Sequence, residues 1–354
     1  MHEKFLLQAL DLAKKRRGFC APNPSVGAVL VRNQQVISFG SHWQAGAPHA
    51  EQVALNQAQN EAKGATLYVT LEPCCHWGRT APCSDLIIDS GIAEVIYGLD
   101  DPNSLVDGQG IQLLRAAGIH CRQLNLPVID EFYRSYHHWQ KTQRPWITAK
   151  LALSLDGKIA AEGGKPVAIT GKDLQEYTHQ CRSQADAILT TSVTLNHDNP
   201  QLNVRLAGET LKKTVYVLDR TLSLLENLQI YQTAAQLVIL HACSEADSKI
   251  ERYHEKGAHC VQIKGKDRLD LEQVIAYIGA QGHHDLWVEA GGRCFEALLQ
   301  NSCINTALIY VSPKTLGKAA YPAFENAHDF LAQARHCDWQ KIGQEVICRI
   351  EISP

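Results

Sequence analysis

Short apolar segments alternate with helical segments along this chain, and this alternation limits the possible folds more than any other feature. In the first half, residues 26–31 and 65–71 have the composition of buried strands, whereas residues 49–60 and 83–90 have that of helices. Strands separated by single helices are typical of an α/β fold, in which helices cover a central sheet. We therefore expect a layered α/β architecture.

The alternation is interrupted once, before the middle of the chain. Residues 128–141 look helical, and the Gln-Arg-Pro sequence at residues 143–145 ends this helix, because proline cannot continue it. A new series of strands begins at Trp146. A chain of 354 residues exceeds the usual domain size of ~100–200 residues. We therefore predict two domains, residues 1–144 and 145–354.

The second half repeats the pattern of the first. Six apolar segments predict strands, at residues 146–153, 187–191, 214–218, 236–240, 285–289 and 305–311. Periodicity predicts helices at residues 172–182, 271–279 and 294–300. In the first half, residues 36–39 read as the hairpin partner of residues 26–31, with Gln34 and Gln35 as the turn.

The composition argues against several classes of protein. The formal net charge is −3, so the chain lacks the basic excess that sequence-independent nucleic-acid binding needs. No segment approaches the ~18 apolar residues of a membrane span, and charged residues interrupt the N-terminal helix, unlike a signal peptide. The 12 cysteines are spread over a long chain, which is not typical of a secreted disulfide scaffold. We therefore expect a cytoplasmic protein without a nucleic-acid or membrane partner.

One set of residues has the pattern of a catalytic zinc site. His49 opens a predicted helix, Cys74 follows Pro73 after a predicted strand, and Cys83 opens the next helix. One imidazole and two thiolates leave the fourth position of tetrahedral zinc open for water, which zinc makes acidic. Glu51, two residues after His49, can move a proton between that water and a leaving amine. The sequence therefore predicts one zinc per chain and a hydrolytic deamination.

Two other interpretations of the cysteines stay open. If Cys75 were also a ligand, the site would be a four-ligand structural zinc, but adjacent residues point apart along an extended chain. Deaminases that edit nucleic acids usually keep two residues between their cysteines, whereas eight separate Cys74 from Cys83. The inserted loop contains Arg79, whose guanidinium suits a phosphate group. These features favour a small phosphorylated substrate over a polynucleotide.

Several motifs resemble one known family along nearly the whole chain. The segment TLEPCCHWGRTAPCSDLI closely resembles the loop of the bifunctional riboflavin-biosynthesis deaminase/reductase family. APNPSVGAVLV, AGAPHAE and DPNSLVDGQG also match in order, and the second half matches through KLALSLDGKIA, ADAILTTSVTLNHDNPQLNVR and WVEAGG. The resemblance implies a cytidine-deaminase-like three-layer N-terminal domain and a dihydrofolate-reductase-like C-terminal domain. It also implies that a phosphoribosylaminopyrimidine is deaminated with zinc and its ribosyl group then reduced to ribityl with NADPH.

The resemblance assigns residues in both halves. In the deaminase half it implies the ligands His49, Cys74 and Cys83, proton transfer by Glu51, and substrate contacts from Asn23, His42, His76 and Arg79. In the reductase half it implies catalysis by Lys150 and substrate contacts from Arg182, Leu202, Arg205 and Glu289. It places Leu153, Thr194, Asp198, Gly291 and Gly292 near NADPH. We also expect a homo-oligomer.

Lys150 and Glu289 end two predicted strands and are the ionisable candidates for the reduction. The Gly291-Gly292 pair falls between a predicted strand and a predicted helix, a sensible phosphate cradle although not the spaced-glycine dinucleotide fingerprint. The chain has Pro166 and Ala168 where the family usually has serine and tryptophan. This departure leaves one alternative, an active deaminase whose reductase-like domain only binds or scaffolds.

Overall fold

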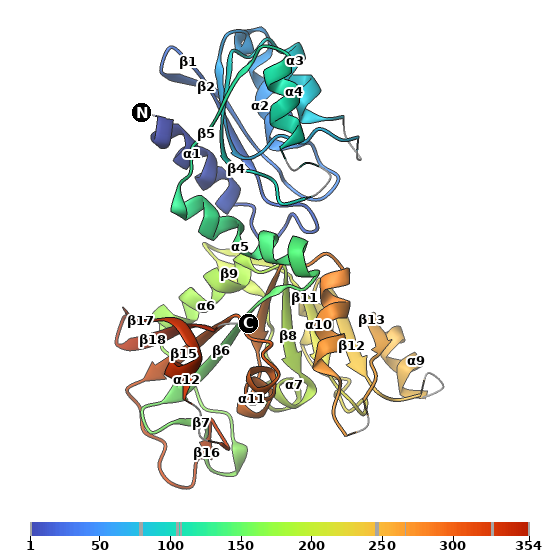
Figure 1. Ribbon diagram of the computed structural model, residues 1–354. Coiled ribbons are helices and arrows are strands. Elements are labelled where there is room, and N and C mark those ends of the chain that lie inside the picture. Colours follow the sequence, from blue (N-terminus) through green and yellow to red (C-terminus); the bar gives the residue numbers. More distant parts are fainter. Residues whose placement is uncertain are drawn as a thin grey trace. The chain divides into compact units, whose positions relative to one another are not determined.

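The computed structural model describes residues 2–77, 81–103, 106, 108–244, 248–265, 267–326 and 329–352. The chain divides into two units, Met1–Gln143 and Arg144–Pro354 (Figure 1). In the described part of the chain, no helix is long and apolar enough to cross a bilayer.

A five-stranded sheet in the order β2-β1-β3-β4-β5 forms the centre of the N-terminal unit. Its strands are β1 (Gly27–Arg32), β2 (Gln35–Ser41), β3 (Thr66–Leu71), β4 (Glu94–Leu99) and β5 (His120–Gln123). The helices are α1 (His2–Lys14), α2 (Ala50–Ala58), α3 (Cys83–Asp89), α4 (Gln109–Ala116) and α5 (Pro127–Thr142), with a 3₁₀ turn, η1, at Gln59–Ala62. β1 runs antiparallel to both neighbours, whereas β3, β4 and β5 are parallel.

Helices cover both faces of this sheet and give the expected three layers. On one face, α2, α3 and α4 bury residues such as Ala54, Ile87 and Leu114 against the strands. On the other face, α1 and α5 bury residues such as Leu10 and Ile129. The parallel strands β3 and β4 lie between the two cores and are apolar along most of their length, as strands buried on both faces must be.

The turn of the β1–β2 hairpin lies one residue earlier than predicted. Arg32 pairs with Gln35, so the turn residues are Asn33 and Gln34 rather than Gln34 and Gln35. Both turn residues have positive φ, 50° and 65°. A two-residue hairpin turn that fits the strand twist needs positive φ at both positions, and asparagine tolerates this conformation better than most residues.

The C-terminal unit has a nine-stranded sheet in the order β13-β12-β11-β8-β14-β6-β15-β18-β17. The strands from β13 to β15 in this order are parallel, and β18 and β17 are antiparallel. They are β6 (Trp146–Ser154), β8 (Ala187–Thr191), β11 (Thr214–Leu218), β12 (Gln236–His241), β13 (Ala258–Gln262), β14 (Asp285–Glu289), β15 (Thr306–Ser312), β17 (Ala334–Ile342) and β18 (Glu345–Ile352). Two small ribbons pair β7 (Lys158–Ala160) with β16 (Tyr321–Pro322), and β9 (Val204–Leu206) with β10 (Glu209–Leu211).

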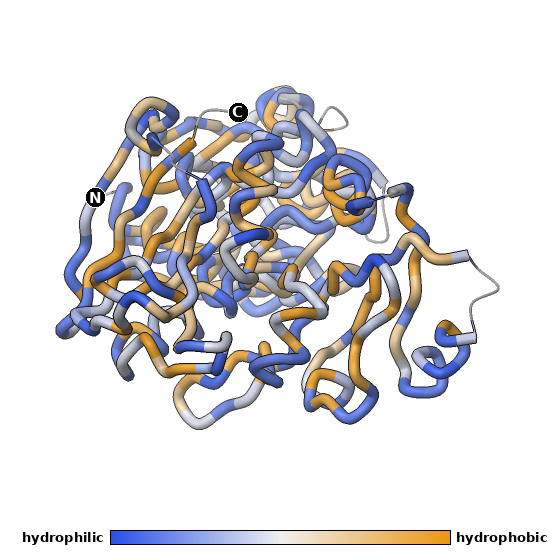
Figure 2. Tube along the Cα trace, turned by 90° about the horizontal axis from the view of Figure 1, so that it is seen from below, coloured by the Kyte–Doolittle hydropathy of each residue, from blue (hydrophilic) through white to orange (hydrophobic). Residues whose placement is uncertain are grey.

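Helices cover both faces of the large sheet as well. On one face lie α10 (Leu271–Ala280) and α11 (Gly292–Gln300). On the other lie α6 (Lys172–Gln184), α7 (Ser192–Asp198), α8 (Ile230–Thr233) and α9 (Ser248–Glu255). The remaining elements are a 3₁₀ turn, η2 (Glu162–Gly164), and α12 (Phe330–Gln333). In Figure 2, hydrophobic stretches alternate with hydrophilic connections, as expected for buried strands joined by surface loops.

Candidate active sites

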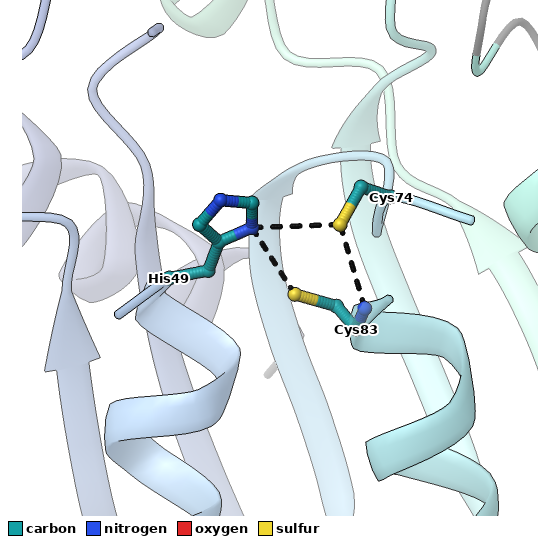
Figure 3. A group of neighbouring side chains, drawn as sticks. All are labelled: His49, Cys74 and Cys83. Atoms are coloured by element: carbon teal, nitrogen blue, oxygen red, sulfur yellow. Dashed lines mark hydrogen bonds between the residues drawn. The ribbon is translucent and has the colours of Figure 1, made fainter. Parts of the chain in front are cut away.

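Three side chains from separate elements of the N-terminal unit converge on one point. Nδ1 of His49 lies 3.4 Å from Sγ of Cys74 and 3.3 Å from Sγ of Cys83 (Figure 3). The three potential ligand atoms all lie within 4.8 Å of one another. No other group of three such ligand residues occurs in the part of the chain that the structure describes. Cys75, the alternative ligand, is outside the group.

Local structure brings each of these side chains to the site. His49 is the extended residue before the first turn of α2, Cys74 follows the end of β3, and Cys83 is the first residue of α3. The backbone N–H of Cys83 donates to Sγ of Cys74 at 3.4 Å, and the N–H of Ser84 donates to the carbonyl of Cys74 at 3.1 Å. The positive N-terminus of α3 therefore faces the Cys74 sulfur, which favours a thiolate there.

The donor set and its spacing fit zinc. With zinc bonds of ~2.0–2.1 Å to nitrogen and ~2.3 Å to sulfur, tetrahedral geometry places the nitrogen and sulfur atoms roughly 3.5 Å apart. The observed separations of 3.3 and 3.4 Å agree with this value. Three ligands from one imidazole and two thiols are the set found in catalytic rather than structural zinc sites, because one position remains for water or substrate.

The three side chains of this group shift one another's pKa values. A hydrogen bond with the Cys83 thiol lowers the pKa of Cys74 well below its ordinary value, while that bond and burial raise the pKa of Cys83. A hydrogen bond with Cys74 raises the pKa of His49 to about 8. The site thus favours negative sulfur beside positive imidazole. A divalent cation would displace these protons and be held by two thiolates and a neutral imidazole.

Glu51 lies on the first turn of α2 beside the three ligands. Its side chain is 3% exposed. Burial disfavours the carboxylate and raises its pKa to about 7, although His49 and a hydrogen bond with Cys83 act in the opposite direction. A carboxyl group with a pKa near neutrality can both accept and donate a proton.

Asn23 and His42 form a hydrogen-bonded chain next to the metal group. Nδ1 of His42 donates to the carbonyl oxygen of Pro48 at 3.1 Å, so Nε2 of the neutral ring accepts from the Asn23 amide at 3.2 Å. The His42 ring lies edge-on to the His49 ring, with centroids 5.3 Å apart. Burial lowers the pKa of His42, which keeps the ring neutral. His42 is therefore a buried neighbour of the site and not an ordinary surface histidine.

The loop between Cys74 and Cys83 is described only in part. His76 is half-buried, and its Nδ1 has no hydrogen-bond partner among the described residues. Arg79, the predicted phosphate ligand, lies outside the described residues.

Sequence reasoning missed one buried residue beside the site. Glu72 directly follows β3, and its carboxylate accepts hydrogen bonds from the backbone of Asp101, Gly108 and Ile111. Its position just before Pro73 and Cys74 was the one available signal, but a glutamate beside a motif is by itself uninformative.

In the C-terminal unit, Arg182 and Glu289 form a bidentate ion pair. Nε of Arg182 donates to Oε1 of Glu289, and Nη2 donates to Oε2 at 2.9 Å. Both side chains are 11% exposed. Burial raises the pKa of Glu289, but Arg182, Lys150 and a hydrogen bond from Trp287 outweigh it and lower the pKa to about 2. The structure therefore brings together two residues predicted to contact the substrate, Arg182 from α6 and Glu289 from β14.

Lys150 belongs to the same cluster, but its place in the strand differs from the prediction. It lies in the middle of β6 rather than at a strand end, directly opposite Glu289 in the parallel pair β6–β14. Its Nζ lies 5.4 Å from the centre of the Tyr310 ring. Burial lowers the pKa of Lys150, and the Glu289 carboxylate opposes part of that effect. The strand predicted at residues 146–153 already placed Lys150 near its middle, so the description of Lys150 as a strand end was wrong.

Most of the residues predicted to lie near NADPH gather at the carboxyl ends of three neighbouring strands. Leu153 lies near the end of β6, Thr194 in the first turn of α7 after β8, and Gly291 just after β14. The N–H of Thr194 donates to Oγ1 of Thr191 at 3.1 Å and so begins α7. Ligands of parallel α/β sheets bind at this edge. Asp198 is exposed at the end of α7.

The two glycines after β14 have different surroundings. A Cβ on Gly292 would lie 1.8 Å from the carbonyl oxygen of Ala323, so only glycine fits this packing. A Cβ on Gly291 would meet nothing within 4 Å. The backbone at Gly291 therefore borders open space at the N-terminus of α11. Gly292 instead packs against the backbone of Ala323.

The other reductase residues are more dispersed. Arg205 is exposed, and its guanidinium donates to Gln201 and Asn203. The Leu202 side chain is buried in the core, with a positive φ of 46°, so only its backbone can meet a ligand. Pro166 and Ala168 are exposed, and the carbonyl of Ala168 accepts from Lys314.

Two family models together match most of the chain. The model of the cytidine and deoxycytidylate deaminase zinc-binding region matches residues 1–99, and the model of the RibD C-terminal domain matches residues 145–348. Residues 1–99 include His49, Cys74 and Cys83.

Relatives and solved structures match over nearly the full length. The riboflavin biosynthesis protein RibD of Aquifex aeolicus is 37% identical over 320 residues, covering 89% of this chain and 88% of the relative. RibD of Escherichia coli is 34% identical over 329 residues, covering 90% of this chain and 89% of the relative. Form 1 of Acinetobacter baumannii RibD superposes with a TM-score of 0.87 at 29% identity, covering 100% and 99%. A second solved structure superposes with a TM-score of 0.87 at 30% identity, covering 99% of each chain. It is a diaminohydroxyphosphoribosylaminopyrimidine deaminase/5-amino-6-(5-phosphoribosylamino)uracil reductase from Thermotoga maritima.

Proposed function

Because the chain belongs to the RibD family of riboflavin biosynthesis proteins, we propose that its two units hold two active sites that act in succession on one substrate. The chain is a bifunctional enzyme, a deaminase and a reductase, and its cofactors are zinc and NADPH. The group His49, Cys74 and Cys83, with Glu51 buried beside it, carries the proposal. We assign deamination to residues 1–144 and reduction to residues 145–354.

The deamination exchanges an amino group for oxygen on a pyrimidine ring. The substrate is 2,5-diamino-6-(5-phosphoribosylamino)pyrimidin-4-one, by analogy with the activity named for the Thermotoga maritima relative. His49, Cys74 and Cys83 hold zinc, which supplies an acidified water when bound. Glu51 accepts a proton from the attacking water and delivers it to the amino group that leaves. One water is consumed and one ammonia is released.

The surrounding residues orient the pyrimidine. The Asn23 amide nitrogen already donates to His42, so the Asn23 carbonyl oxygen is the atom that faces donors of the substrate. His42, held neutral by its bond to Pro48, fixes that orientation. His76 and Arg79 belong to the segment between Cys74 and Cys83 in the sequence. We assign to them the recognition of the phosphoribosyl part of the substrate.

The reduction opens the ribosyl ring by hydride addition. Leu153, Thr194, Asp198, Gly291 and Gly292 would hold NADPH, which would supply the hydride when bound. Lys150 provides the proton that accompanies the hydride, and its lowered pKa makes this transfer easier. Glu289, held ionised by Arg182, keeps Lys150 in place across the strand pair. Leu202 and Arg205 complete the substrate contacts, Leu202 through its backbone.

The comparisons give no support to the alternative of a reductase-like domain that only scaffolds, because the RibD C-terminal domain model matches residues 145–348. Pro166 and Ala168 are exposed and outside the Lys150 cluster, so their departure from the family pattern leaves that cluster complete. We further propose a cytoplasmic homo-oligomer, which remains a prediction.

Two variants separate the reactions. Lys150→Ala should release ammonia normally and accumulate the deaminated pyrimidine. Cys83→Ser should release no ammonia from the first substrate, yet still oxidise NADPH when supplied with the deaminated intermediate. Loss of both activities in each variant would show that the two sites are not independent, and would contradict the assignment of one reaction to each unit.

A further inference from the structure

A buried glutamate joins the segment that carries Cys74 to a neighbouring helix. Glu72 is 3% exposed and is not a member of the metal group. Its Oε2 accepts from the N–H of Gly108 at 2.9 Å and of Asp101 at 3.3 Å, and its Oε1 accepts from the N–H of Ile111 at 3.3 Å. These donors belong to the connection after β4 and to the first turn of α4.

Glu72 takes the place of a capping residue for α4. The residue before this helix is Gly108, which has no side chain to accept hydrogen bonds from the free N–H groups of the first turn. Glu72 lies just after the end of β3 and accepts from one of these groups, the N–H of Ile111, and from the N–H of Gly108 itself. Its negative charge also lies at the positive end of the helix, which is the favourable arrangement.

A second contact fixes the same segment. A Cβ on Gly110 would lie 2.1 Å from the carbonyl oxygen of Pro73, so the backbone of α4 packs directly against the residue before Cys74. The packing of Gly110 against Pro73 and the hydrogen bonds of Glu72 therefore both tie this segment to the start of α4. The next residue along the chain, Cys74, must place its sulfur 3.4 Å from His49 Nδ1.

We propose that Glu72 is a positioning residue that holds Cys74 in the geometry for zinc by tying its segment to α4. Among the described residues, its hydrogen bonds go to backbone N–H groups and not to the sulfur or imidazole atoms of the metal group, so it acts through Cys74. This role rests on the proposed function of the N-terminal unit. Residues that orient metal ligands typically contribute ~10–100-fold to metal affinity or activity.

The test compares zinc retention in full-length variants. Zinc affinity is measured by competition with a chromophoric chelator for wild type, Glu72→Ala and Glu72→Gln. We expect Glu72→Ala to bind zinc about 10–100-fold more weakly. The zinc affinity of Glu72→Gln should lie between those of wild type and Glu72→Ala. The glutamine oxygen can still accept a hydrogen bond, but its NH₂ group faces backbone N–H donors. In both variants the amides of Gly108 and Ile111 should exchange with solvent faster.

Two controls separate positioning from general destabilisation. Leu114→Ala removes a fully buried side chain of α4 without touching the Glu72 bonds, so it weakens the same helix. Glu296→Gln alters a buried carboxylate that binds backbone N–H groups of Glu325 and Asn326 in the other unit. Both should retain zinc within about threefold of wild type, a difference below one kcal/mol.

Two results would overturn the inference. Glu72→Ala could bind zinc as tightly as wild type, or lose zinc no more readily than Leu114→Ala at a matched urea midpoint. A wild-type chain that holds no zinc would instead contradict the proposed function, and the positioning role with it.

Discussion

Replacing Glu289 by glutamine should destabilise the C-terminal unit in a way that depends on pH. The substitution keeps the shape of the side chain but leaves the Arg182 guanidinium buried without a counter-charge. The pKa of Glu289 is about 2, against an ordinary value of 4.5. At 1.36 kcal/mol per pKa unit, the ionised carboxylate contributes roughly 3 kcal/mol. Removing one partner of a buried ion pair costs ~3–5 kcal/mol, which agrees.

The sign of the pH dependence follows from the depressed pKa. The stabilisation is fully present above pH 4.5 and is lost as the pH falls towards 2, because the native carboxylate must then take up a proton. The difference between wild type and Glu289→Gln should therefore be largest at pH 7 and shrink below pH 4.5.

The assay is hydrogen-exchange mass spectrometry in increasing urea, which reports the opening free energy of peptides from β14 and β6 within the full chain. Glu226→Gln is the matched control, because Glu226 pairs with Arg252 at 3.4 Å where both side chains are about half exposed. Such pairs contribute ~0–1 kcal/mol. A loss of stability in Glu289→Gln below 0.5 kcal/mol would be no larger than the ~0–1 kcal/mol of an exposed pair. Such a loss, or one that stays constant from pH 7 to 3.5, would show that the ionised Glu289 does not stabilise this unit.

Three further predictions concern the metal, the proton carrier and the glycine pair. Cys83→Ser should lose zinc, as measured by atomic absorption, whereas Cys75→Ser should keep it; the opposite pattern would reassign the ligand. Glu51→Gln should keep zinc but release ammonia ~10²–10⁴-fold more slowly, and a rate within about threefold of wild type would remove Glu51 from the mechanism. Gly292→Ala should cost at least ~1–3 kcal/mol in the same exchange assay, because its Cβ would lie 1.8 Å from a carbonyl oxygen. Gly291→Ala, with open space at its Cβ, should change the unfolding free energy little, and equal losses for the two variants would contradict this account of the pair.

The sequence predicted the layers because most of the parallel strands are buried on both faces. Such strands, for example β11 and β12, contain continuous apolar runs that stand out from their surroundings. β17 was not predicted, because it is an edge strand with mostly exposed residues and no apolar alternation. β18 alternates buried and half-buried residues and could have been found.

The proposed metal ligands were accessible to sequence reasoning, whereas the residues that support them were not. His49, Cys74 and Cys83 have distinctive chemistry and lie at helix or strand ends, so composition and spacing identify them. The Glu72 bonds to the backbone before and within α4 join residues 29 to 39 positions apart. The Arg182–Glu289 pair joins residues 107 positions apart. Contacts of this kind depend on the tertiary fold, and no local pattern encodes them.

Product analysis with the purified full-length chain shows whether one protein carries out both reactions. The chain is given the diaminopyrimidine substrate, and ammonia, NADPH oxidation and the mass of the product are followed together. We expect ammonia release without NADPH and, once NADPH is added, one NADPH oxidised for each ammonia, with the ribityl product. After zinc removal by a chelator, only a supplied deaminated intermediate should be reduced. Accumulation of that intermediate with no NADPH oxidation, or undiminished ammonia release from the zinc-free chain, would exclude a zinc deaminase and an NADPH reductase in this chain.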